Sequence, residues 1–107
     1  MTTFDLVIFD CDGVLVDTET INNEVISQLL NEAGLEMSPD EVATRTTGLA
    51  YSEMWEMFED EVPGCLPADI EEQQLARESE RFRKELLPMP GAVETVRCLS
   101  DAGMPMC

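Results

Sequence analysis

The chain has 107 residues, the size of one small domain or of part of a larger protein. Its 23 acidic and 6 basic residues give a formal net charge of −17, so nucleic acid and anionic membranes would repel it, and we expect neither as a partner. A hydrophobic fraction of 44% is typical of a globular protein and argues against disorder throughout. A strongly solvated surface is the simplest interpretation of the charge; adaptation to high salt is an alternative.

The cysteine pattern argues against both a structural zinc site and disulfides. Cys11, Cys65, Cys98 and Cys107 form no close pair in the sequence, and there is no histidine. The first five residues lack the basic and apolar regions of a signal peptide, and no apolar stretch approaches the roughly 20 residues needed to span a bilayer. We therefore expect a soluble, cytoplasmic protein with reduced thiols.

The first predicted element is a strand over residues 6–9. The apolar run LVIF lies there between Asp5 and Asp10. A continuous apolar run of this length suits a strand that is buried on both faces, as in parallel sheets. Because almost nothing else in the chain could pair with it or cover it, we expect the chain to self-associate or to be partly unfolded around residues 4–12.

Three helices are predicted next. The first covers 20–33 and is ended by Gly34. Its apolar stripe consists of Ile21, Val25, Leu29 and Leu30. The sequence SPDE at 38–41 is a capping box with proline at the first helical position, and it starts a second helix that ends near residue 48. A third helix is expected from residue 52, with a buried side formed by Met54, Trp55, Met57 and Phe58.

Two more helices complete the predicted pattern. After a turn-rich loop at 62–67, a helix is expected over 68–86. The residues at helical spacing along it are Leu75, Ser79, Phe82 and Leu86. A Pro-Gly turn then precedes a short helix over 91–102, which we expect to direct Val93, Val96 and Leu99 inward and to stop at Gly103.

Two carboxylates follow the predicted strand directly. Asp10 and Asp12 are two residues apart, and Gly13 lets the backbone turn after them. In open α/β sheets, chemistry occurs at the carboxyl ends of parallel strands, where an aspartate can accept a phosphoryl group. A second aspartate on the same face could protonate the leaving group and later activate water.

The segment FDCDGVLVDTE at 9–19 resembles the first motif of the haloacid dehalogenase (HAD) superfamily. Its sequence is similar to the form that this motif takes in the β-phosphoglucomutase/phosphatase branch. The resemblance implies an α/β fold: a HAD-like (Rossmannoid) core with an inserted α-helical cap. Residues 1–17 would be the first core strand and catalytic loop, 18–88 the helical cap, and 89–107 the return to the core. The core would then be truncated after the first strand and the return helix.

The same resemblance implies roles for the loop. Asp10 would be the nucleophile and Asp12 the general acid/base. A magnesium ion would bind the Asp10 carboxylate and the Asp12 backbone carbonyl. Backbone N–H groups of Cys11, Asp12 and Gly13 could bind the phosphate. The family's Ser/Thr after the second strand, later lysine and distal acidic pair have no counterpart here, so we expect the front part of an enzyme, inactive alone.

The leading hypothesis is a Mg²⁺-dependent phosphatase acting on a small phosphorylated metabolite, expected to be a sugar phosphate. A phosphosugar mutase is the alternative within this branch, but its members carry a histidine early in the cap where Asn22 stands here.

A non-catalytic acidic helical fragment is another alternative. A calcium-binding EF-hand beginning at Asp10 fails, because Leu15 and Ile21 occupy positions that require glycine and glutamate. Asp17 and Glu19 are interpreted as helix-capping residues, and the oligomeric state stays open.

Overall fold

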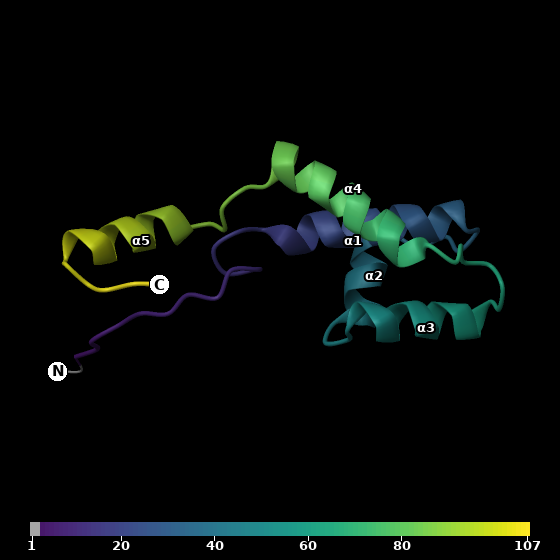
Figure 1. Cartoon of the computed structure of the whole chain (residues 1–107), viewed down its shortest axis with the longest axis horizontal. Helices are drawn as coiled ribbons and strands as arrows, with labels where there is room; N and C mark the ends of the chain where they lie inside the picture. Colours follow the sequence, from purple (N-terminus) through teal and green to yellow (C-terminus); the bar gives the residue numbers. More distant parts are fainter. Residues whose placement is uncertain (1–2) are drawn as a thin grey trace.

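The structure is a computed structural model that describes residues 3–107, and it places five helices in two separate groups. The helices are α1 (Thr18–Glu32), α2 (Pro39–Thr46), α3 (Tyr51–Glu61), α4 (Ile70–Glu85) and α5 (Ala92–Asp101). Helices α1 to α4 gather at one end, in what we call the helical unit (residues 18–86). Helix α5 lies at the other end with the extended N-terminal segment, and these form the terminal unit (residues 3–17 and 87–107) (Figure 1).

This arrangement makes the chain elongated. It measures 56 × 28 × 21 Å, and its radius of gyration is 17.8 Å. A compact chain of similar length would have a radius of gyration of about 13 Å. The two units are therefore joined end to end and do not share one core.

The first three helices form as the sequence predicts, with bounds that differ by one or two residues. The capping box before α2 is present: Ser38 N–H donates to the Glu41 carboxylate (2.8 Å), and Glu41 N–H donates to Ser38 Oγ (3.2 Å). The predicted apolar stripe of α1 is buried, as are Met54, Trp55 and Phe58 of α3. Met57, predicted inside, is only half-buried.

Helix α4 begins two residues later and ends one residue earlier than predicted, and it buries only part of the predicted face: Phe82 and, just after the helix, Leu86 pack against the core. Leu75, which the apolar spacing includes, is 58% exposed. The buried positions are instead Ile70, Gln74 and Glu78, four residues apart along one side of the helix. Trp55 Nε1 donates to Gln74 Oε1 (2.7 Å), and Gln74 Nε2 donates to Glu78 Oε1 (2.8 Å). Because the polar groups of Gln74 and Glu78 are hydrogen-bonded, these side chains can be buried at positions where the spacing of apolar residues did not predict burial.

Among the described residues, every buried apolar side chain belongs to the helical unit. This core is formed by Ile21, Val25, Ile26, Leu29, Leu30, Val42, Met54, Trp55, Phe58 and Ile70. Helix α1 supplies half of it and packs against α2 and α4. No helix within residues 3–107 combines the length and the apolar character needed to cross a membrane.

The terminal unit corrects two predictions about residues 6–9. They form no regular strand and are not buried, since Ile8 is 74% exposed. Nor are they unpaired. Val7 N–H donates to the Pro105 carbonyl (3.0 Å), Cys107 N–H donates to the Val7 carbonyl (3.1 Å), and the pairing is parallel. The segment is exposed because nothing among residues 3–107 covers its faces.

Helix α5 forms where predicted, after Gly91 with a φ of +81°, but it buries no residue. Val93, expected to point inward, is 37% exposed, whereas Val96 and Leu99 are half-buried. An amphipathic helix with too little surface to pack against stays partly solvated, which explains the difference.

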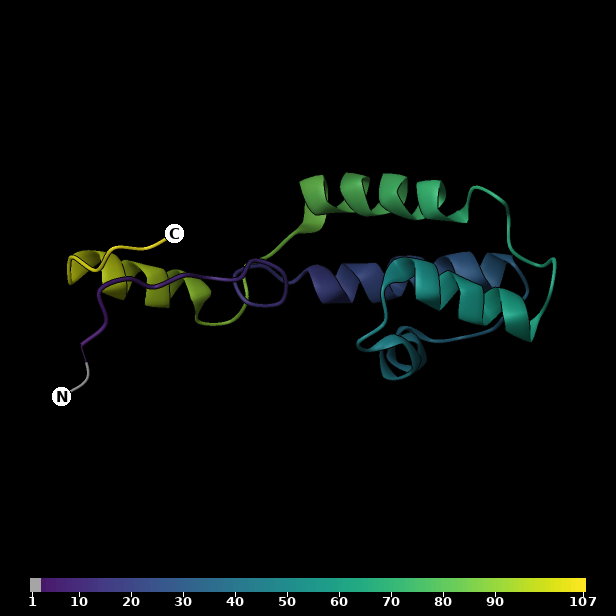
Figure 2. The ribbon, with the colours of Figure 1, turned by 60° about the horizontal axis from the view of Figure 1, so that its bottom comes forward.

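The two units are joined by two chain segments that run side by side. Asp17 N–H donates to the Leu87 carbonyl (2.9 Å), and Met89 N–H donates to the Leu15 carbonyl (2.9 Å). Val16 and Pro88 form an antiparallel bridge between them. Figure 2 shows this junction between α1 and α5. The helical unit therefore leaves the terminal unit and returns to it at one place.

The contrast between two leucines tests where the stabilising core lies. Leu30→Ala, at a side chain with no exposed surface, should lower the free energy of unfolding by about 2–5 kcal/mol through lost burial and the resulting cavity. Leu75→Ala should change it by less than about 0.5 kcal/mol. Urea unfolding followed by helical circular dichroism measures both. Equal losses would contradict the assigned face of α4.

Candidate active site

The two aspartates lie on a tight loop at the end of the paired segment. Leu15 N–H and Val16 N–H both donate to the Cys11 carbonyl (2.9 and 3.2 Å). Gly13 N–H donates to the Val16 carbonyl (2.9 Å), and Gly13 has a φ of +70°, which a side chain would strain. The loop is thus held by its own backbone, and it leaves Asp10 and Asp12 exposed.

The polar groups of this loop differ in what they are free to bind. Cys11 N–H donates to Asp10 Oδ1 (2.8 Å), and Gly13 N–H is used within the loop. The N–H and carbonyl of Asp12 make no hydrogen bond with residues 3–107. In this conformation, the groups available to a ligand include the backbone N–H and carbonyl of Asp12, the Asp12 carboxylate and one Asp10 carboxylate oxygen.

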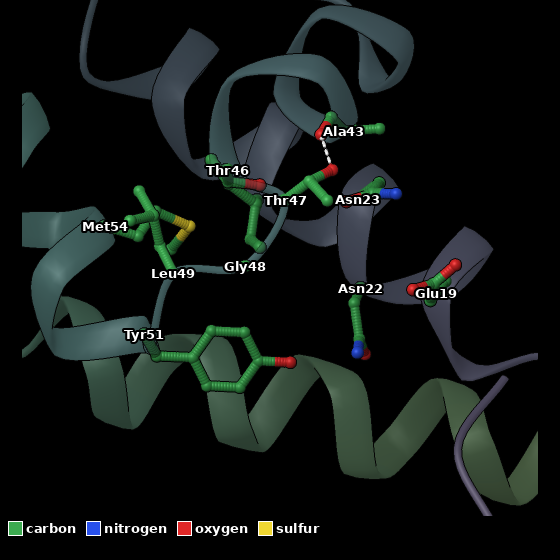
Figure 3. Close-up of a pocket in the computed structure, with 11 residues that line it drawn as sticks. Glu19, Asn22, Asn23, Ala43, Thr46, Thr47, Gly48, Leu49, Tyr51 and Met54 are labelled. Atoms are coloured by element: carbon green, nitrogen blue, oxygen red, sulfur yellow. Dashed lines mark hydrogen bonds between the residues drawn. The ribbon is translucent and has the colours of Figure 1, made fainter.

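A pocket opens beside the loop, between α1 and the segment that joins α2 to α3. It encloses about 220 Å³, which is small compared with the sites of drug-sized ligands and fits a small metabolite. Glu19 and Asn22 approach it from α1, and Tyr51 from the start of α3 (Figure 3). The loop is close by: a Cβ added to Gly13 would lie 3.9 Å from Glu19 Cδ.

Two polar atoms near this pocket are buried without a partner. They are Thr18 Oγ1 and Asn22 Oδ1, from residues four apart on α1. A buried polar atom without a hydrogen bond costs about 1–3 kcal/mol. Such atoms are uncommon in folded proteins and call for an explanation, such as a bound ligand or water.

Two acidic groups on different elements influence Tyr51. Burial, then the charges of Glu78 and Asp12, raise the pKa of the Tyr51 hydroxyl. Burial also raises the pKa of Glu78, and the hydrogen bond from Gln74 opposes this. Charged groups of the loop and of α4 thus both influence Tyr51, at the start of α3. Sequence reasoning missed Tyr51 and Glu78 as site residues, because no local motif brings the three elements together.

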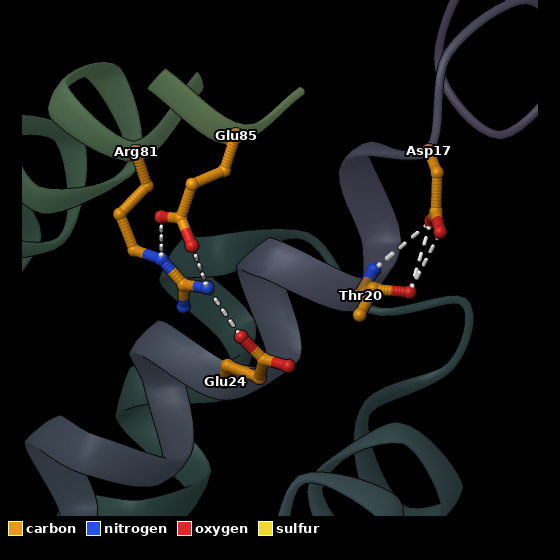
Figure 4. Close-up of polar contacts among 5 residues, drawn as sticks. All are labelled: Asp17, Thr20, Glu24, Arg81 and Glu85. Atoms are coloured by element: carbon orange, nitrogen blue, oxygen red, sulfur yellow. Dashed lines mark hydrogen bonds and ion pairs between the residues drawn. The ribbon is translucent and has the colours of Figure 1, made fainter. Parts of the chain in front are cut away.

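Figure 4 shows two groups of polar contacts made by residues of α1. Asp17 accepts from Thr20 N–H (3.3 Å) and Thr20 Oγ1 (2.9 Å), which confirms it as the N-cap of α1. Arg81 on α4 pairs with Glu85 and reaches across to Glu24 on α1. Glu19, also interpreted as a capping residue, makes no hydrogen bond with the described residues and faces the pocket.

The described residues do not form a cluster of metal-binding side chains. Within 3–107, no three His, Cys, Asp or Glu side chains come close enough to hold a metal ion together. All four cysteines are free thiols, and Cys65 is the half-buried one. The donors on the loop are oxygens: the Asp10 carboxylate, the Asp12 carboxylate and the free Asp12 carbonyl.

Comparison with known proteins identifies the family. Residues 7–107 match the family model of haloacid dehalogenase-like hydrolases, so the chain belongs to this family. It is 32% identical to a 6-phosphogluconate phosphatase of Escherichia coli (strain K12) over an alignment of 109 positions, which covers 100% of the chain and 48% of that protein. It is also 32% identical to an uncharacterized protein of Schizosaccharomyces pombe, over 91% of the chain and 39% of that protein.

Solved structures agree on the fold. A haloacid dehalogenase-like protein of unknown function from Agrobacterium tumefaciens str. C58 matches with a TM-score of 0.86 and 33% identity, over 98% of the chain and 46% of that protein. A HAD family hydrolase from Deinococcus radiodurans R1, with bound phosphate and sodium, matches with a TM-score of 0.76 and 32% identity, over 97% and 45%. The chain therefore spans less than half the length of these relatives.

The buried Glu78 makes stability depend on pH. Because burial raises its pKa above the ordinary 4.5, the folded chain holds the proton to higher pH than the unfolded chain. Stability should therefore fall as pH rises from 4.5 through the folded pKa. Glu78→Gln keeps an acceptor for Gln74 and should remove this fall, making the variant more stable than the parent at pH 7 but not at pH 4.

Thermal unfolding between pH 4 and pH 8 measures this effect. Glu56→Gln is the matched control, because it removes the same single charge from an exposed position on α3. An unchanged pH dependence in Glu78→Gln, or an equal change in both variants, would refute the role of Glu78.

Proposed function

We propose that the chain is the nucleophile-bearing part of a Mg²⁺-dependent phosphatase that hydrolyses a small phosphorylated metabolite, a sugar phosphate, through an aspartyl-phosphate. The observation that carries this proposal is the loop itself. Asp10 and Asp12 lie exposed at the end of a parallel-paired segment, beside a small pocket with a mixed polar and apolar lining. The similarity to a 6-phosphogluconate phosphatase and to a phosphate-bound hydrolase supports phosphoryl chemistry.

The two units correspond in this proposal to the two parts of the family's fold. Residues 1–17 and 89–107 would begin the α/β core, and 18–88 would be the helical cap. The parallel pairing of residues 7–9 with 105–107 is the pattern expected of the first two core strands. The junction of the two connecting segments supports the cap, because it brings both ends of residues 18–86 to one place, as expected of a segment inserted into another domain.

The proposed reaction assigns one role to each aspartate. A carboxylate oxygen of Asp10 attacks phosphorus, and the bond from phosphorus to the leaving oxygen breaks. Asp12 gives its proton to that oxygen, so the metabolite departs as a neutral alcohol. Asp12 then removes a proton from water, which attacks the aspartyl-phosphate, releases inorganic phosphate and restores Asp10.

The donor set on the loop suits magnesium. Its oxygens are hard ligands, and Mg²⁺ binds through one or two carboxylates while keeping several waters. The Asp10 carboxylate and the unbonded Asp12 carbonyl would hold the ion. Its chemistry would be to neutralise charge on the transferring phosphoryl group.

Backbone N–H groups of Cys11, Asp12 and Gly13 would assist with the phosphate. The Asp12 N–H is free, whereas Cys11 N–H donates to Asp10 and Gly13 N–H donates to Val16. A bound phosphate would compete with the Asp10 carboxylate for the Cys11 N–H.

Hydrolysis is favoured over mutase activity because Asn22 stands at the pocket, and an amide does not transfer protons at neutral pH. A cytoplasmic setting is proposed on the four free thiols.

Replacing the nucleophile tests the proposal. In the native gene product that contains this chain, Asp10→Asn should reduce magnesium-dependent hydrolysis of p-nitrophenyl phosphate to background, because an amide cannot attack phosphorus. Asp5→Asn, at an exposed position in the same segment, should keep activity. Near-full activity in Asp10→Asn would refute the assignment of the nucleophile.

The second aspartate is tested through the leaving group. Asp12→Asn should slow hydrolysis of alkyl phosphates by about 10²–10⁴-fold, because their leaving oxygens need a proton. Aryl phosphates with acidic leaving groups should lose much less in single-turnover measurements of the first step. Equal losses for both classes would argue against Asp12 as the general acid.

A further inference from the structure

The pocket beside the catalytic loop presents acceptors that lack donors. Asn22 Oδ1 is buried and unpartnered, and the Glu19 carboxylate makes no hydrogen bond with residues 3–107. In Figure 3 the Tyr51 hydroxyl and the Asn22 amide extend into the same space. Ligand hydroxyl groups would satisfy these acceptors, because each O–H donates one hydrogen bond. A ligand carboxylate has no proton to donate.

The pocket also lacks positive charge. No lysine or arginine lines it. Three of the arginines in the helical unit are engaged elsewhere: Arg45 with Glu61, Arg77 with Glu32, and Arg81 with Glu24 and Glu85.

The nearby charges are negative instead. Glu19 lines the pocket, and its carboxylate makes no ion pair with residues 3–107. A carboxylate or second phosphate on the substrate would enter this field without a counter-charge from the helical unit, and placing like charges together is unfavourable.

We propose that the end of the substrate remote from the reacting phosphate enters this pocket, and that this end is an uncharged, hydroxyl-bearing chain or ring. Asn22 and Glu19 accept hydrogen bonds from its hydroxyls, and Tyr51 donates to one of them. The inference rests on the proposed function and adds the chemical class of the substrate. The preference differs from that named for the relative from Escherichia coli, since 6-phosphogluconate carries a carboxylate.

Two phosphates that differ only at the remote end provide the test. Glucitol 6-phosphate ends in a CH₂OH group and 6-phosphogluconate in a carboxylate. In the native gene product with magnesium, kcat/KM should favour glucitol 6-phosphate by at least about tenfold, as expected for an uncompensated like charge. Equal values, or a preference for 6-phosphogluconate, would overturn the proposal.

A charge-matched pair of variants locates the preference. Glu19→Gln should raise kcat/KM for 6-phosphogluconate, because it removes the repelling charge. The ratio of kcat/KM for glucitol 6-phosphate to kcat/KM for 6-phosphogluconate should therefore decrease. Glu94→Gln removes the same charge from an exposed position on α5 and should keep the ratio. Equal narrowing in both variants would show a general charge effect and overturn the assignment to this pocket.

A binding measurement separates this inference from the proposed function. Without magnesium and in EDTA, glucitol 6-phosphate should shift the NMR resonances of the Asn22 amide and Tyr51 more than 6-phosphogluconate does at the same concentration. If p-nitrophenyl phosphate and both sugar phosphates stay unhydrolysed with magnesium, the proposed function fails. The NMR titration still tests whether the pocket binds the uncharged end of the substrate. Equal shifts for the two ligands, or no shifts, at Asn22 and Tyr51 would overturn this inference.

Discussion

The backbone pairing between residues 15–17 and 87–89 is the constraint on which the rest of the structure depends. Its hydrogen bonds hold together the two ends of a helical segment of about seventy residues. Because both ends are held at one place, the start of α1 lies beside the loop that carries Asp10 and Asp12. The pocket lies between α1 and the segment that joins α2 to α3, close to this loop.

The helical unit combines an apolar core with one buried polar line. Hydrogen bonds join Trp55, Gln74 and Glu78 across α3 and α4. Burial raises the pKa of Glu78, and the charge of Glu78 in turn helps to raise the pKa of Tyr51. The terminal unit has no such core, which explains the exposure of Ile8 and the absence of any buried residue on α5.

The division of chemistry between the units follows from their composition. The loop offers exposed carboxylates and a free carbonyl oxygen but no apolar enclosure. The helical unit offers a pocket lined by Glu19, Asn22 and Tyr51, whereas its Arg45, Arg77 and Arg81 are held in ion pairs elsewhere. We infer that the loop acts on the phosphate whereas the helical unit reads the remainder of the substrate.

The sequence by itself determined what local rules control. The capping box at Ser38, the N-cap at Asp17 and the stripe of α1 could be read from spacing, because caps and amphipathic faces involve neighbours within a few turns. Asp10 and Asp12 were found in the same way, from two carboxylates after an apolar run.

Only the tertiary structure decided which side of α4 is buried, that residues 6–9 pair with the end of the chain, and that the charges of Glu78 and Asp12 both raise the pKa of Tyr51. These features depend on contacts between segments far apart in the sequence. No local pattern encodes such contacts, because their energies arise only when the helices pack.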